Sequence, residues 1–355
     1  MTGVEKGFEK PRLGDEHLAA WSKAQRADVT HFDARFVEDE ATLERLIMGE
    51  VDHDSSAAKT SALEGLEEPS PGSGSGASPS CMRSISFAFN RHFSPSWSKR
   101  CANFHFLDLN HLPDLNDDSL LAFLEGNRNL VELQLYWNPQ LTESALQKIP
   151  EYCPYLKSLS LAGCMKLSDV ALAAISAAPY YARSLEHLDL TRCPKITSRS
   201  VRKVTRRLNS LRVLRVYAAA ALSAEAFELS SMPNLELLDA CGTAIEDRNF
   251  EALARAYPHD SKEQHLRLKV LNLTWCTLIT DAGIAALCQS AVRDLAELSL
   301  FGNLNISEES LRLLGQKFGH SLHTLDINGC TNIPNRAPED VLRYLPNVTR
   351  FVVHT

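Results

Sequence analysis

The stretch "LKVLNLTWCTLITDAGIAALC", residues 268–288, decides the fold of this chain. Its first six residues place leucines at the first, fourth and sixth positions, which is the pattern of a short, half-buried strand. Thr280 then supplies a helix N-cap, and Ile284 and Leu287 fall on one face of a helix over 281–291. One such unit cannot bury its own apolar face, so it requires neighbours of the same design.

The same pattern recurs along most of the chain at intervals of 24–33 residues. The copies begin at Phe104, Leu130, Leu156, Leu185, Leu211, Leu235, Leu268, Leu295 and Leu322, with a stub at Val348. A near-constant period of this length is the signature of a solenoid in which each repeat packs on the next. The sequence therefore predicts an α/β solenoid over residues 104–355, with nine repeats, parallel strands inside and helices outside.

Cysteines recur at one position of the repeat, just after the strand. They are Cys164, Cys193, Cys276 and Cys330. Other repeats carry Asn, Leu, Ala or Thr at this position, so it tolerates different chemistry. A structural zinc site needs ligands that converge at short C-x₂₋₄-C spacing, whereas these cysteines recur at the repeat distance. The pattern predicts structural cysteines that pack in the core, and no metal site.

These repeats resemble the cysteine-containing leucine-rich repeats of F-box/LRR substrate receptors, which belong to SCF ubiquitin ligases. The resemblance covers about residues 104–355 and depends on the pattern L-x-x-L-x-L-x-x-C/N-x-x-I/L. It implies a ribonuclease-inhibitor-like horseshoe that recognises a protein partner or substrate on its concave face. If a degenerate F-box exists, it also implies the SCF adaptor subunit and a cullin as partners.

The resemblance does not extend to the first 80 residues, which lack the Leu-Pro-x-Glu-like start of an F-box. The expectation of a ligase role therefore depends on the resemblance of the repeats alone. The alternative is a structural scaffold or assembly subunit of a larger complex, cytoskeletal or axonemal, with no ubiquitin role.

Residues 1–80 differ from the rest of the chain in charge and composition. They carry a net charge of −8 within a total of −7, and they end in the Gly/Ser/Pro tract "EEPSPGSGSGASPS" (67–80). The sequence predicts an acidic, mostly disordered tail over 1–80 and an N-terminal cap over 81–103. Two stretches of the tail, 15–27 and 36–48, have helical periodicity. They indicate either transient helices or partner-docking motifs.

The inner face and its rim are the predicted partner-binding surface. Strand residues between the leucines are expected to be exposed on the concave side, and aromatic side chains follow several strands. Large aromatic residues and arginine are enriched where proteins bind one another. The predicted site comprises Tyr136, Trp137, Asp189, Arg192, Tyr217, Asp239, Trp275, Phe301 and Asp326. The alternative for each ring is that it packs against the adjacent turn.

Several functional classes find no support in the sequence. It contains no glycine-rich phosphate loop, no His-Glu-x-x-His motif and no serine elbow, so we expect no enzyme activity and no cofactor. The acidic net charge disfavours nucleic acid, and no long apolar run predicts a membrane span. The first residues resemble neither a signal nor a transit peptide, which favours the cytoplasm, the nucleus or both.

A basic run, "TRCPKITSRSVRKVTRRLNSLRVLR" (191–215), interrupts this acidic chain in the fourth repeat. Such a run usually forms the solvated face of a helix. A patch for phosphate or an acidic partner is the alternative.

Overall fold

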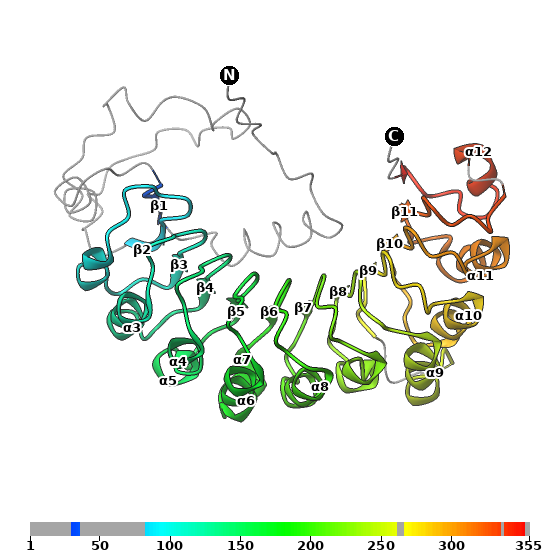
Figure 1. The fold of residues 1–355 in the computed structure, drawn as a ribbon. Helices are drawn as coiled ribbons and strands as arrows, with labels where there is room; N and C mark the ends of the chain where they lie inside the picture. Colours follow the sequence, from blue (N-terminus) through cyan, green and yellow to red (C-terminus); the bar gives the residue numbers. More distant parts are fainter. Residues whose placement is uncertain (1–29, 36–81, 261–265, 335–336, 352–355) are drawn as a thin grey trace, which may run out of the picture.

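The computed structural model describes residues 30–35, 82–260, 266–334 and 337–351. These residues form an open horseshoe with the strands along the inner edge and the helices along the outer edge (Figure 1). One twelve-stranded parallel sheet runs through the molecule, and its strand order follows the chain from β1 to β12. The predicted α/β leucine-rich-repeat solenoid is therefore confirmed.

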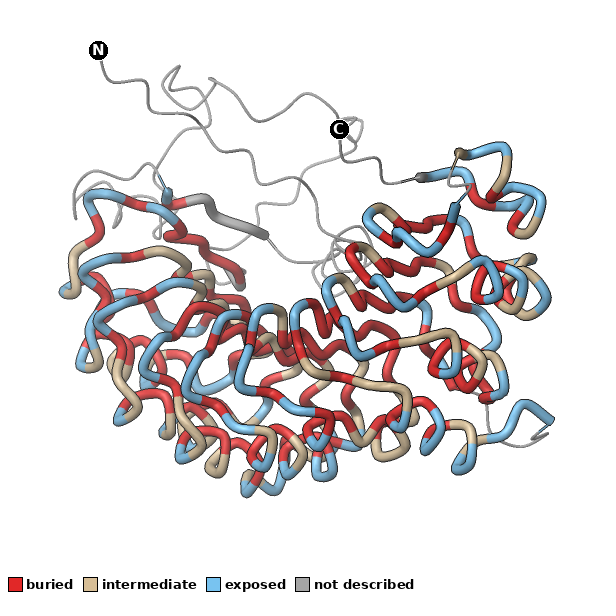
Figure 2. Tube along the Cα trace, turned by 45° about the vertical axis from the view of Figure 1, so that its right-hand side comes forward, coloured by how far each residue is buried: buried red, intermediate tan, exposed pale blue. Residues whose placement is uncertain are grey.

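The strands are short because each repeat contributes only its L-x-L segment to the sheet. Their central leucines pair in register from repeat to repeat, as Leu107, Leu133 and Leu159 do, and all three are buried. The strands are β1 (Thr30–Asp33), β2 (Met82–Ser86), β3 (Phe106–Asp108), β4 (Glu132–Gln134), β5 (Ser158–Ser160), β6 (His187–Asp189), β7 (Val213–Arg215), β8 (Leu237–Asp239), β9 (Val270–Asn272), β10 (Glu297–Ser299), β11 (Thr324–Asp326) and β12 (Arg350–Phe351). Buried residues concentrate along these strands, and exposed residues gather at the outer bends (Figure 2).

The helices return the chain to the next strand. They are α3 (Asp117–Gly126), α4 (Glu143–Leu146), α5 (Ile149–Tyr152), α6 (Asp169–Ala177), α7 (Tyr181–Ser184), α8 (Ser198–Arg207), α9 (Asp247–Ala256), α10 (Asp281–Gln289), α11 (Glu308–Phe318) and α12 (Pro338–Val341), with 3-10 turns η2 (Pro95–Lys99), η3 (Ala224–Ala226) and η4 (Leu229–Ser231). Three repeats depart from the single predicted helix, and one of them, 156–184, adds the short helix α7 after α6. A second short helix, α5, begins at Ile149, because Pro150 lacks the N–H that would continue α4. The shortest repeat, 211–234, has only η3 and η4 in place of a helix.

The helix starts form a ladder that ties the repeats together. Thr280 caps α10 as predicted, because its hydroxyl accepts the N–H of Ala282. The next residue, Asp281, bridges to the following repeat by accepting hydrogen bonds from the N–H and the hydroxyl of Ser307, at 2.9 and 2.5 Å. Burial acts to raise the pKa of Asp281, but hydrogen bonds from Ser307 and Ser310 outweigh it and hold the pKa below its usual value.

The N-terminal end of the sheet holds structure that the repeat pattern did not predict. The predicted cap, 81–103, contains β2 and η2, and β1 extends the sheet by pairing in parallel with β2. Four aromatic side chains, Phe87, Phe93, Trp97 and Phe123, pack here with ring centroids 5.9–6.2 Å apart. The linker and both helical stretches of the tail lie outside the described residues. Within the described part of the chain, no helix is long and apolar enough to cross a membrane.

Candidate partner-binding rim of the inner face

Every strand from β2 to β11 leads into a turn that contains one residue with positive φ. The residues at this position are Phe89, His111, Trp137, Gly163, Arg192, Ala218, Gly242, Trp275, Gly302 and Gly329, with φ between 54 and 75°. This backbone conformation disfavours side chains with a Cβ, yet the repeat geometry imposes it at each turn. The residues that occupy the position, together with the residue directly before each, are therefore aligned along one edge of the sheet, which we call the rim.

Both rim tryptophans pack against the next turn and still face solvent. A Cβ added to Gly302 would lie 2.6 Å from Cε3 of Trp275, and one added to Gly163 would lie 2.8 Å from Cε3 of Trp137. The two glycines therefore leave room for the neighbouring indole rings. Even so, Trp275 is 55% and Trp137 39% exposed. The rings are held by the fold and also remain available to a partner.

The predicted rim residues come together in three pairs, each built from neighbouring positions. The Trp275 and Phe301 rings meet edge to face with centroids 5.2 Å apart, and the Tyr136 and Trp137 centroids lie 6.1 Å apart. In the third pair, the Arg192 guanidinium lies 5.5 Å from the centre of the Tyr217 ring, a cation–π geometry. These three rim pairs are spread along the sheet, so the site is a discontinuous row and not one patch.

The three predicted acids of the inner face have a structural role that the sequence analysis missed. Asp189, Asp239 and Asp326 each accept, through Oδ1, the backbone N–H two residues further on, at 2.9–3.2 Å. This contact stabilises the turn at the strand exit. Asp239 and Asp326 are 1% and 4% exposed and Asp189 is half-buried, so the expectation of an exposed acidic row is wrong. The recurrence of Asp or Asn at this position of the repeat could have indicated this structural role.

Other inner-face residues that the sequence analysis overlooked lie on β7, β8 and β9. Val213, Leu237 and Val270 are paired neighbours in the sheet register and form an apolar cluster separate from the main core. All three are at most 1% exposed. Since neither this cluster nor two of the three acids is open to solvent, the exposed part of the candidate site is the rim.

A buried histidine lies on the same face, at the start of β6. Nδ1 of His187 is 3.1 Å from the Ser158 hydroxyl on β5. Burial lowers the pKa of His187 to about 4; Asp189 opposes this shift and Arg215 adds to it. His187 is therefore neutral near pH 7.

The repeat cysteines donate hydrogen bonds between neighbouring repeats. The pairs are Cys164 with the carbonyl of Leu135, Cys193 with Leu161, Cys276 with Ala240 and Cys330 with Leu300, at 3.1–3.5 Å from sulfur to oxygen. Asn138 and Asn303 make the same bond from Nδ2 in their own repeats, which explains why the position accepts both residues. Burial raises the pKa of Cys276 to about 12, so its thiol is protonated.

Among the described residues, no group of His, Cys, Asp and Glu could hold a metal ion.

Known proteins share this architecture. The family model "Leucine Rich repeat" matches residues 267–288. The DNA repair protein rhp7 of Schizosaccharomyces pombe is 23% identical over 282 residues, which cover 66% of this chain and 49% of that protein. This chain thus spans about half the length of that curated relative. In the crystal structure of the Rad7 and Elc1 complex in yeast, one chain matches with a TM-score of 0.52 and 18% identity, over 76% of this chain and 75% of that one. The chain therefore has the fold of a leucine-rich-repeat solenoid.

Proposed function

We propose that this chain is a non-catalytic protein-recognition module that binds a protein partner along the rim of its inner face. The observation that supports this role is the set of rim pairs, above all Trp275 with Phe301, because Trp275 is fixed against Gly302 and still 55% exposed. A rigid aromatic side chain loses little conformational entropy on binding, so it is a favourable anchor. Curved repeat solenoids commonly bind proteins through such extended surfaces.

We further propose that the module acts in an assembly of the ubiquitin-ligase type, in the nucleus. Two similarities support this proposal: the repeats resemble those of F-box/LRR receptors, and a yeast complex of Rad7 with Elc1 contains a chain of the same fold. The name of the fission-yeast relative, a DNA repair protein, supports the nuclear location. The adaptor subunit and a cullin are the partners expected of this assembly.

A scaffold or assembly subunit with no ubiquitin role is the second candidate. The lack of an F-box motif in the first 80 residues favours it. Both candidates use the rim, and they differ in which proteins accompany the chain.

Site-specific photo-crosslinking of the tagged full chain tests both parts of the proposal. A photoreactive amino acid replaces Trp275 on the rim or, as the control, Val170 on outer helix α6, which is also 55% exposed. We expect crosslinks to a protein partner from position 275 and none from position 170. Recovery of an adaptor subunit and a cullin would support the ligase assembly, and their clean absence would remove it. Equal crosslinking from both positions would contradict the rim site.

A further inference from the structure

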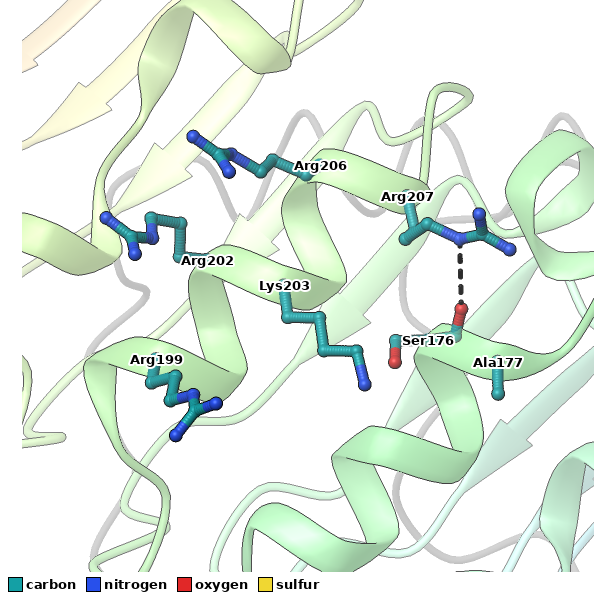
Figure 3. Close-up of a pocket in the computed structure, with 7 residues that line it drawn as sticks. All are labelled: Ser176, Ala177, Arg199, Arg202, Lys203, Arg206 and Arg207. Atoms are coloured by element: carbon teal, nitrogen blue, oxygen red, sulfur yellow. Dashed lines mark hydrogen bonds between the residues drawn. The ribbon is translucent and has the colours of Figure 1, made fainter.

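The outer helix α8 carries a concentrated positive charge that the proposed rim site does not use. Five cationic side chains project from it: Arg199, Arg202, Lys203, Arg206 and Arg207. With Ser176 and Ala177 at the end of α6, they line a hollow of about 500 Å³, which we call the α8 hollow (Figure 3). The buried face of α8 is formed by Ser200, Val201, Val204 and Thr205, so the cations belong to its outward side.

The cations divide into two rows. Arg199, Lys203 and Arg207 point toward the side of α6, whereas Arg202 and Arg206 point to the opposite side of α8 (Figure 3). Residues four apart on a helix are displaced by about 6 Å along its axis, so the first row presents three cations at roughly equal steps. Arg207 donates from Nε to the carbonyl oxygen of Ser176 at 3.4 Å, which holds one end of this row in place.

Few acidic groups balance this charge. Arg206 forms an ion pair with Glu228, but Arg202 and Lys203 form none within the described part of the chain. Burial acts to raise the pKa of Asp169, but hydrogen bonds from Ser200 and Thr197 lower it, and the nearby charge of Arg199 adds to this lowering. The row facing α6 thus has more positive charge than the nearby carboxylates neutralise.

The repeat ladder lacks its usual acid at α8. The helices α3, α4, α6, α9 and α10 all begin with Asp or Glu, which bonds the N-cap hydroxyl of the next repeat. In α8 this position is Ser198, which keeps the link through a 3.0 Å contact with the Ser223 hydroxyl but brings no negative charge. Like charges three and four residues apart destabilise a helix. The repulsion among the cations of α8 therefore costs stability, and α8 lacks the acidic first residue that would offset part of it.

We infer that the α8 hollow is a second docking site, on the outer face, for an Asp/Glu-rich segment of a partner protein. In an extended peptide, alternate side chains point the same way and recur every 6–7 Å or so, close to the steps between Arg199, Lys203 and Arg207. Guanidinium groups bind carboxylates through two parallel hydrogen bonds, which suits a row rich in arginine.

The lining of the α8 hollow disfavours nucleic acid. None of its seven lining residues is aromatic, so a single strand would find no ring on which to stack its bases. Glu225 and Glu228 belong to the adjacent repeat, and Glu225 is exposed. A duplex, which is wider than a peptide, would bring its phosphates toward these carboxylates.

Fluorescence anisotropy with the full chain tests this docking site. The probe is a short labelled peptide in which glutamate alternates with serine, compared with the same peptide carrying glutamine. The variant Arg199→Glu/Lys203→Glu reverses two charges of the hollow, and the matched control Arg248→Glu/Arg255→Glu reverses two exposed charges of α9. We expect binding of the glutamate peptide to the wild type and the control, a loss of about tenfold or more in the hollow variant, and weaker binding as salt rises.

Other results would overturn the inference. Equal losses in both variants would show that the peptide responds only to net charge. Tighter binding of a duplex DNA with the same number of charges would assign the hollow to nucleic acid. Binding that appears only after Glu38, Asp39 and Glu40 are neutralised would assign it to the chain's own acidic segment. If thermal unfolding shows that the hollow variant does not fold, Arg199→Gln/Lys203→Gln replaces it.

Discussion

The rim of the inner face and the outer surface of α8 differ in how far the repeat determines their side chains. On the rim, every side chain occupies a position whose backbone is set by the repeat, and Trp275 is held against Gly302. On α8, the repeat sets only the buried side of the helix, and the cations vary freely on the other side. The proposed rim contacts are therefore preorganised and mainly aromatic, whereas the proposed contacts on α8 are electrostatic.

This comparison separates positions that serve the fold from positions that are free to serve a partner. A residue type that recurs at one position, such as the cysteines or the inner-face aspartates, bonds to its own or the preceding repeat. A side chain at a position that varies among the repeats, such as Trp275 or Lys203, has no such hydrogen bond in the described structure. The positions that vary among the repeats are thus the ones on which both proposed sites are built.

The largest expected effect concerns the packing that fixes the rim. Gly302 and Gly242 have similar φ values, 75 and 69°, but a Cβ at Gly242 would meet only the Cα of Ala218, at 4.0 Å. We expect Gly242→Ala to lower the free energy of unfolding by about 1–2 kcal/mol, the cost of the left-handed backbone. Gly302→Ala should cost about 2–4 kcal/mol, because it also displaces the Trp275 ring. Chemical denaturation measures both costs, and equal values would show that the indole is not held by its neighbour.

A smaller loss is expected where a repeat cysteine is changed. Cys276 is fully buried and donates to the carbonyl of Ala240, so Cys276→Ser introduces a more polar group into a poorly matched site and should cost about 1–3 kcal/mol. Cys288→Ser, at a half-buried position, should cost less. Chelators and reductants should leave the melting temperature unchanged. A large loss of stability with a chelator would contradict the packing role.

The buried histidine should give a modest dependence of stability on pH. Folded His187, with a pKa of about 4, binds a proton less tightly than an unfolded histidine, whose pKa is about 6.5. As pH falls below about 6.5 the unfolded state gains a proton first, so the free energy of unfolding decreases from there toward pH 4. Between pH 7.5 and pH 5, the free energy of unfolding should fall by about 1–2 kcal/mol more in the wild type than in His187→Gln. His320→Gln, at an exposed site, is the control, and the same pH dependence in both variants would refute the assignment.

The sequence predicted the features that follow from periodicity. Leucine spacing places β3 to β11, and the Thr280 cap places the start of α10, because both depend on local patterns. Contacts between repeats were harder to predict. The packing of Trp275 on Gly302 and the cluster of Val213 with its neighbours become visible only when adjacent strands are aligned in register. The strands β1 and β2 were missed because neither carries the leucine pattern.

The central claim, that the rim binds the crosslinked partner without a contribution from Arg202 and Arg206 on α8, is tested most directly by quantitative co-purification. The tagged wild-type chain is compared with Trp275→Ala, Tyr217→Ala and the charge reversal Arg202→Glu/Arg206→Glu, after thermal unfolding has shown that each variant is folded. Loss of an aromatic anchor that becomes buried on binding should weaken binding of the crosslinked partner by at least about tenfold, which corresponds to roughly 1.4 kcal/mol, and so reduce its recovery. The account predicts this loss for both rim variants and near-normal recovery for the charge reversal. The opposite ranking, with the arginines decisive and the aromatic residues silent, would contradict it.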